Sequence, residues 1–192
     1  ASATPFAGAG TFSASTSANT VNYTGAAATI KDPTAGTLHT YYHLGLAGSG
    51  AKTMTAITTI SGNLALSGSA SAAPVITTVG GNLSTAGTAA LTLGANLVVT
   101  GTSTIGDGSS ASTFSQGATF NFTSGAVTVA SLSSWTNTGT GDIVLAGNVS
   151  NAGTITLSSS NGTQCTNATD DIVITSSVGA TQRAWSGAGT FT

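Results

Sequence analysis

Four segments of the chain share one short frame: an apolar residue, two small residues, an asparagine, a leucine or valine, and a closing glycine. They are TTISGNLALSG (58–68), TTVGGNLSTAG (77–87), LTLGANLVVTG (91–101) and IVLAGNVSNAG (143–153), with asparagines at Asn63, Asn82, Asn96 and Asn148. Separations of 19 and 14 residues between the first three are close to one turn of a β-solenoid, whose coils pair in parallel ~4.8 Å apart. The unequal separations predict coils of unequal length.

The frame also predicts where its side chains point. The residue after each asparagine should face the interior of the solenoid: Leu64, Leu83, Leu97 and Val149. The asparagine should lie at a corner, either in a left-handed backbone conformation or stacked on its neighbours as an amide ladder.

Alternation of apolar and small polar residues extends the β pattern beyond these segments. TFNFTSGAVTVASL (119–132), GTITLSSS (153–160) and DDIVITSSV (170–178) alternate in this way and are interrupted by Gly, Asn and Ser. Glutamate is absent, and Lys, Arg and Met together number four, so few strong helix formers are present. We therefore expect an all-β fold with very little helix.

The most consistent architecture is a single elongated parallel β-solenoid (β-helix) with irregular coils, spanning residues 1–192. Coils of about 20 residues predict roughly nine or ten coils and a rod on the order of 45 Å long. An antiparallel β-sandwich, like a pilin subunit that accepts a donated strand, remains an alternative because it also uses short alternating strands.

The charge content limits the possible functions. Three basic residues and five aspartates give a net charge of −2. These basic residues cannot form the stripe that nucleic-acid binding requires. No window approaches the ~20 consecutive apolar residues of a membrane-spanning helix. A nearly uncharged surface provides little repulsion between copies, which favours an assembled state.

The two ends of the chain repeat one phrase. FAGAGTFS (6–13) and WSGAGTFT (185–192) share five identical residues in the same frame. Solenoids expose strand edges at both ends, and matching ends can pair head to tail without closing. We expect residues 1–13 to form a stacking or donated strand and 185–192 to form its counterpart. The predicted assembly residues are Phe6, Gly8, Gly10, Phe12, Trp185, Gly187, Gly189 and Phe191. Alternatively, the ends match only because the chain is one period of a longer repeat.

A family resemblance rests on residues 19–70. The segments TVNYTG (20–25), HLGLAGSGAKTM (43–54), which follows a tyrosine pair, and TTISGNLALSG (58–68) resemble the β-strand repeats of large bacterial surface and autotransporter-like adhesin proteins. That resemblance implies a parallel β-helix exposed outside the cell. The family commonly places a GTF(S/T) strand before such a segment, as in GAGTFSAS (8–15), so SGAGTFT (186–192) looks like the opening strand of a next unit.

These observations favour a structural subunit of an extracellular, cell-surface filament or surface layer whose partner is a second copy of itself. Alternatives are the stalk segment of an adhesin and an ice- or glycan-binding solenoid. Thr-x-Thr triplets begin at Thr53, Thr102, Thr136, Thr138 and Thr154, at intervals that do not repeat by coil. With acids and bases few and dispersed, we expect no enzyme activity, no catalytic residue and no cofactor.

Other candidate sites are sparse. LHTYYHL (38–44) predicts a strand with His39, Tyr41 and His43 on one side, the histidines ~13 Å apart and unable to share a metal ion. Lys31-Asp32-Pro33 predicts a turn with a weak ion pair. Asp171 should begin a strand, and we expect no metal site. Cys165 has no cysteine partner within the chain and could only bridge between subunits.

Six N-x-(S/T) triplets are possible glycosylation sites in a secreted chain: Asn22, Asn82, Asn121, Asn148, Asn161 and Asn167. Attached sugars would give this surface the solubility that its few charges do not.

Overall fold

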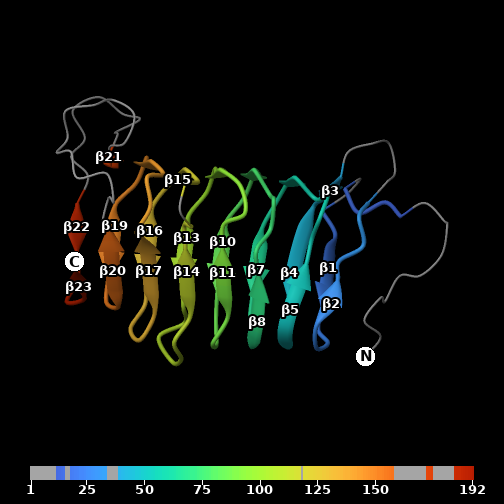
Figure 1. Ribbon diagram of the computed structural model, residues 1–192, viewed down its shortest axis with the longest axis horizontal. Helices are drawn as coiled ribbons and strands as arrows, with labels where there is room; N and C mark the ends of the chain where they lie inside the picture. The colour runs from blue at the N-terminus through green and yellow to red at the C-terminus, as the bar shows by residue number, and fades with distance from the viewer. Residues whose placement is uncertain (1–11, 16–17, 34–38, 118, 158–171, 175–183) are drawn as a thin grey trace.

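Short strands and tight corners wind into three parallel sheets that are stacked along one axis in the computed structural model (Figure 1). The structure describes residues 12–15, 18–33, 39–117, 119–157, 172–174 and 184–192, and all statements below concern these residues. They contain strands and corners but no helix, so the all-β expectation is confirmed.

Each coil contributes one strand to each sheet, in the chain order sheet I, sheet II, sheet III. Sheet I consists of β3 (Thr40–Tyr41), β6 (Thr59–Ile60), β9 (Thr78–Val79), β12 (Leu97–Val99), β15 (Phe122–Ser124), β18 (Ile143–Leu145) and β21 (Ile172–Ile174). Sheet II consists of β1 (Thr20–Tyr23), β4 (His43–Leu46), β7 (Leu64–Leu66), β10 (Leu83–Thr85), β13 (Ser103–Ile105), β16 (Val127–Val129), β19 (Val149–Asn151) and β22 (Trp185–Ser186). Sheet III consists of β2 (Ala28–Thr29), β5 (Ser49–Thr53), β8 (Ser69–Ala72), β11 (Ala90–Thr92), β14 (Thr113–Ser115), β17 (Ser134–Asn137), β20 (Thr154–Leu157) and β23 (Thr190–Phe191).

The strand register confirms a parallel β-solenoid and excludes the antiparallel sandwich for the described residues. Strand β10, for example, pairs in parallel with β7 on one side and β13 on the other. Paired positions in sheet II are 44, 64, 83, 103, 127, 149 and 185, so successive coils differ by 20, 19, 20, 24, 22 and 36 residues. The coils are irregular, as expected. The estimate of nine or ten coils is wrong because the later coils are longer than 20 residues, leaving sheets of eight, eight and seven strands.

The core lies between the three sheets and is built from columns of inward residues. As the sequence predicts, Leu64, Leu83, Leu97 and Val149 are buried, each no more than 2% exposed. The inward column of sheet II runs through Val21, Leu44, Leu64, Leu83, Ser103, Val127, Val149 and Trp185. That of sheet III runs through Ala28, Lys52, Ala72, Leu91, Phe114, Trp135, Ile155 and Phe191.

Aromatic side chains fill the middle of the core. Phe114 and Phe122 have ring centroids 4.8 Å apart, and Trp135 lies 5.6 Å from Phe122 in an edge-to-face arrangement. Phe122 belongs to sheet I, whereas Phe114 and Trp135 belong to sheet III. The rings therefore join two sheets, and the quadrupole preference for edge-to-face contact adds to the burial of apolar area.

The corner between sheets II and III depends on glycine in its early coils. Gly68 and Gly87 have φ of 70° and 66°, and a Cβ at Gly68 would meet the carbonyl oxygen of Gly48 at 2.4 Å. Positive φ and this close stacking both favour glycine over other residues. At the same corner of a later coil Leu132 adopts φ 66° and is 68% exposed, so here a leucine accepts the strained conformation.

The framed asparagines lie at corners, immediately before strands, but not in the left-handed conformation. Asn63, Asn82 and Asn148 precede strands of sheet II, whereas Asn96 precedes β12 of sheet I. The separation of 19 residues is therefore one coil, but reading the separation of 14 residues as a coil is wrong. It spans only part of a coil, because the corners before sheets I and II have the same local sequence.

Candidate assembly site

The last described coil exposes aromatic side chains at the C-terminal pole of the solenoid. The ring of Trp185 on β22 lies 5.4 Å from that of Phe191 on β23, centroid to centroid. Phe191 is 43% exposed although it continues an inward column of the core. Together with Ile155, Leu157 and Thr192, these rings line an open apolar cavity of about 500 Å³. In the interior an equivalent position would be covered by the next coil.

The glycines between these two rings allow the corner to stack tightly. Gly187 has φ 117°, and a Cβ there would meet the carbonyl oxygen of Asn151 at 1.9 Å. Asn151 also donates a hydrogen bond from Nδ2 to the carbonyl oxygen of Thr190 at 2.9 Å. Trp185, Gly187, Gly189 and Phe191 are therefore brought together in one coil.

The N-terminal copy of the phrase occupies a different part of the coil. Ala14 bridges Tyr41 of sheet I in parallel, and Phe12 packs 6.0 Å from the Tyr41 ring. Phe191 instead lies in sheet III. The expectation that both copies of GAGTF mark the same coil position is therefore wrong for these two phenylalanines. Phe6, Gly8 and Gly10 lie outside the described residues.

A hydrogen-bonded tyrosine pair closes the first coils near the N-terminal pole. Tyr23 and Tyr41 join through their hydroxyl groups at 2.8 Å, and Tyr41 donates to the carbonyl oxygen of Lys31. The Lys31 N–H donates to Tyr23 Oη at 3.1 Å. Burial raises the pKa of both tyrosines above the usual value of 10.0.

The histidine segment does not form the single strand that the sequence predicts. Tyr41 ends β3 and His43 begins β4, so a corner at Tyr42 separates the histidines into different environments. His39, with φ 43°, lies 2.7 Å from Asp32, which takes the place of the expected Lys31–Asp32 pair. His43 Nδ1 accepts the N–H of Asn63 at 2.8 Å. Each imidazole thus supports a local corner.

A buried lysine, which sequence reasoning missed, ties the first two coils together. Lys52 is 1% exposed and donates from Nζ to the carbonyl oxygens of Gly25, Ala26 and Ser49 at 2.7, 2.5 and 3.0 Å. Burial lowers its pKa. Its alternation with Met54 in SGAKTMT (49–55) was the available signal, because both positions have the inward parity.

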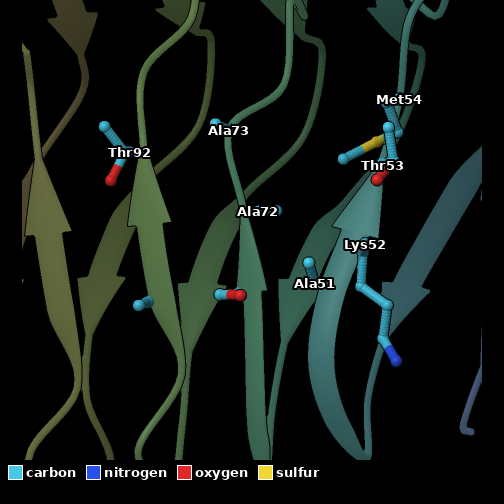
Figure 2. A pocket seen from close by; sticks show the side chains of 9 residues that line it. Ala51, Lys52, Thr53, Met54, Ala72, Ala73 and Thr92 are labelled. Carbon is cyan, nitrogen blue, oxygen red and sulfur yellow. The ribbon is translucent and has the colours of Figure 1, made fainter. Parts of the chain in front are cut away.

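A shallow groove of about 290 Å³ crosses the outer face of sheet III over β5, β8 and β11. Figure 2 shows the lining side chains of Ala51, Ala73 and Thr92, with the Lys52 side chain extending away from the others along its strand. Because the Lys52 ammonium is bound to main-chain carbonyls, the groove presents small, uncharged side chains. Such a surface supplies neither a general acid nor a general base.

Further along the same face, hydroxyl side chains lie in two parallel columns. Thr113, Ser134, Thr154 and Thr190 form one, and Ser115, Thr136, Thr156 and Thr192 form the other. The Oγ1 atoms of Thr156 and Thr192 are 3.0 Å apart. The Thr-x-Thr search did not find this register because serine occupies some of its positions.

Of the possible glycosylation sites, Asn22, Asn82 and Asn148 are exposed. Asn121 is partly buried and donates from Nδ2 to Asp142 at 3.3 Å, a bond that a glycan at Nδ2 would remove. Asn161, Asn167, Cys165 and Asp171 lie outside the described residues, although β21 begins at Ile172.

Among the described residues, no three His, Cys, Asp or Glu side chains cluster as metal ligands, and no helix is long and apolar enough to cross a membrane. Comparisons with protein-family models, curated proteins and solved structures find no match to this chain. Functional inference therefore rests on the geometry of the solenoid.

Proposed function

We propose that this protein is the structural subunit of an extracellular filament or surface layer, in which copies add head to tail by pairing the strand edges at their poles. The observation that carries the proposal is the aromatic C-terminal pole. Phe191 and Trp185 have the register of core residues, yet Phe191 is 43% exposed on an edge strand. A second copy would bury this surface as another coil does in the interior.

The edge strands give the pole hydrogen-bonding capacity as well as apolar area. Within the described residues, β22 and β23 end sheets II and III on one side, and β1 and β2 end them on the other (Figure 1). Uncovered parallel edges favour the addition of another strand. A repeated contact between opposite poles is open and therefore propagates as a fibre.

Composition supports an extracellular assembled state. With eight Lys, Arg, Asp and Glu side chains in 192 residues, charge repulsion between copies is weak. The likeness of residues 19–70 to surface adhesin repeats is consistent with a location at the cell surface. The proposal assigns no catalytic residue and no cofactor.

Electron microscopy and sedimentation of the purified chain test this proposal. The parent protein should form unbranched filaments, and Phe191→Ser should shift the population towards short particles. Val98→Ser is the matched control, because Val98 is 44% exposed on the lateral face of sheet I. Particles that never elongate under any condition would refute the filament and favour the alternative, the stalk segment of a surface adhesin.

The hydroxyl columns of sheet III favour a second candidate function, an ice- or glycan-binding face. Their spacing is ~4.8 Å between coils and ~6.6 Å along a strand, so hydroxyl and methyl groups repeat in two dimensions without charge. Thermal hysteresis that is lost in Thr154→Lys would support ice binding. Absence of hysteresis in the parent protein would remove that option.

A further inference from the structure

We infer that the junction between copies has one defined register: β22 of one copy pairs with β1 of the next, and β23 pairs with β2, so that Trp185 stacks on Val21 and Phe191 stacks on Ala28. This inference rests on the proposed head-to-tail function and specifies the partner surface. It also predicts that the solenoid continues across the junction without a change of phase.

The phase of the coils supports this register. The chain runs through sheets I, II and III in that order, and the first described coil begins with Ala14 against sheet I, followed by β1 and β2. At the other pole the last strands are β21, β22 and β23, in the same order. Each pole therefore presents one strand position of every sheet, and a second copy can continue all three sheets together.

The inward columns fix the alignment along the strands. Trp185 follows Val149 in its column, and Val21 precedes Leu44 in the same column of sheet II. In sheet III, Phe191 follows Ile155, and Ala28 precedes Lys52. Joining the columns places Trp185 next to Val21 and Phe191 next to Ala28. A shift by one residue would turn the aromatic rings' partners to the outer face.

Side-chain size is complementary in this alignment. The C-terminal pole presents two large rings around a cavity of about 500 Å³, whereas the N-terminal pole presents Val21 and Ala28 in the facing positions. Neither Val21 nor Ala28 is fully buried in the isolated chain. Large residues facing small ones allow layers to interdigitate without voids or clashes.

Outward residues acquire partners of the same kind. The register places Ser186 beside Asn22 on sheet II, since Ser186 follows Trp185 and Asn22 follows Val21. On sheet III it places Thr192 beside Thr29, which extends the threonine column across the junction. All four side chains are exposed in the isolated chain and available to a second copy.

Engineered cysteines test the register. In a Cys165→Ser background, Asn22→Cys combined with Ser186→Cys places two thiols on neighbouring parallel strands, ~4.8 Å apart between Cα atoms and within disulfide range. Thr20→Cys combined with Ser186→Cys is the matched control. Thr20 is exposed on the same strand but lies two residues out of register, which puts its Cα more than ~7 Å from that of Ser186.

After mild oxidation, the Asn22/Ser186 cysteine pair should give a ladder of covalent multimers on a denaturing, non-reducing gel, and the Thr20/Ser186 pair should remain monomeric. Circular dichroism of both variants shows whether each retains the β fold. A ladder from the control pair, or filaments in the microscope with no ladder from either pair, overturns the register but leaves head-to-tail assembly standing. Absence of both ladders and filaments refutes the proposed function itself.

Discussion

Asn63 Oδ1 accepts a hydrogen bond from the main-chain N–H of Asn82, one coil further along the chain, at 2.9 Å. Asn82 Oδ1 in turn accepts the N–H of Thr102 at 2.9 Å. The same link recurs at the corner before sheet I, from Asn121 N–H to Asn96 Oδ1 and from Asp142 N–H to Asn121 Oδ1. The ladder expectation is thus correct in a modified form, because each amide binds the main chain of the next coil.

Removing one of these links should weaken the solenoid modestly. Asn82→Ala loses the acceptor for both the N–H and the Oγ1 of Thr102, at 2.9 and 3.2 Å. We expect a loss of about 1 kcal/mol in the free energy of unfolding. Urea denaturation measures it, with Asn82→Asp as a control that keeps the oxygen acceptor. An equal loss in both variants would contradict a role for the acceptor.

Two substitutions at the corner between sheets II and III should have opposite effects. Gly68→Ala adds a Cβ at φ 70°, 2.4 Å from the Gly48 carbonyl oxygen, and should destabilise the fold by about 1–3 kcal/mol. Leu132→Gly removes a side chain from φ 66° that is 68% exposed, and should raise stability by about 0.5–1 kcal/mol. Thermal unfolding compares both with the parent, and a loss of stability in Leu132→Gly would argue against strain at this corner.

Lys52 should be more important for stability than its position near one pole suggests. Lys52→Met leaves the buried carbonyl oxygens of Gly25, Ala26 and Ser49 without their donor, and about 1–3 kcal/mol should be lost. Lys31→Met is the control, because Lys31 is only partly buried and its recorded hydrogen bonds come from the main chain. Equal urea midpoints for the two variants would mean that the three bonds add nothing.

The tyrosine pair should make the first coils sensitive to alkali. Because the folded pKa of Tyr23 and Tyr41 is raised above 10.0, the unfolded chain loses these protons first. Their contribution to stability is therefore fully present below pH 10 and is lost as the pH rises above it. Tyr23→Phe should reduce this alkaline loss, whereas the control Tyr42→Phe should keep it, as melting temperatures from pH 8 to about pH 11.5 would show.

Lys52 acts in the opposite sense over part of the same range. Its lowered folded pKa means that the unfolded chain binds more protons between that value and 10.5, so stability rises with pH there. Comparing each tyrosine variant with the parent at the same pH cancels this contribution. A Tyr23→Phe curve parallel to that of the parent would contradict the assigned role of the pair.

Alternation and the asparagine frame were sufficient to predict the fold class and the inward residues of the framed strands. Leu64 and Leu83, for example, occupy the predicted inward positions. The corner assignment of Asn96 was not predictable, because the three corners of a coil are locally similar. The two-residue strand β3 also left no periodic signal to separate His39 from His43.

The candidate site was predicted only in part. The aromatic residues of 185–192 could be identified because phenylalanine is scarce and recurs in the same frame, six times in the chain. Their exposure at a pole, and the different position of Phe12, depend on how coils stack. Lys52 was missed because a lysine in an alternating segment is normally read as solvent-facing, and its carbonyl partners lie as many as 27 residues away.

The axial repeat of assembled particles tests the central claim most directly. Eight strands per sheet at ~4.8 Å predict filaments with a subunit rise of about 38 Å and a strong ~4.8 Å repeat along the filament axis. Cryo-electron microscopy or fibre diffraction measures both values. Filaments with a ~4.8 Å repeat perpendicular to their axis, or a subunit rise unrelated to the stack of strands, would contradict assembly through the poles.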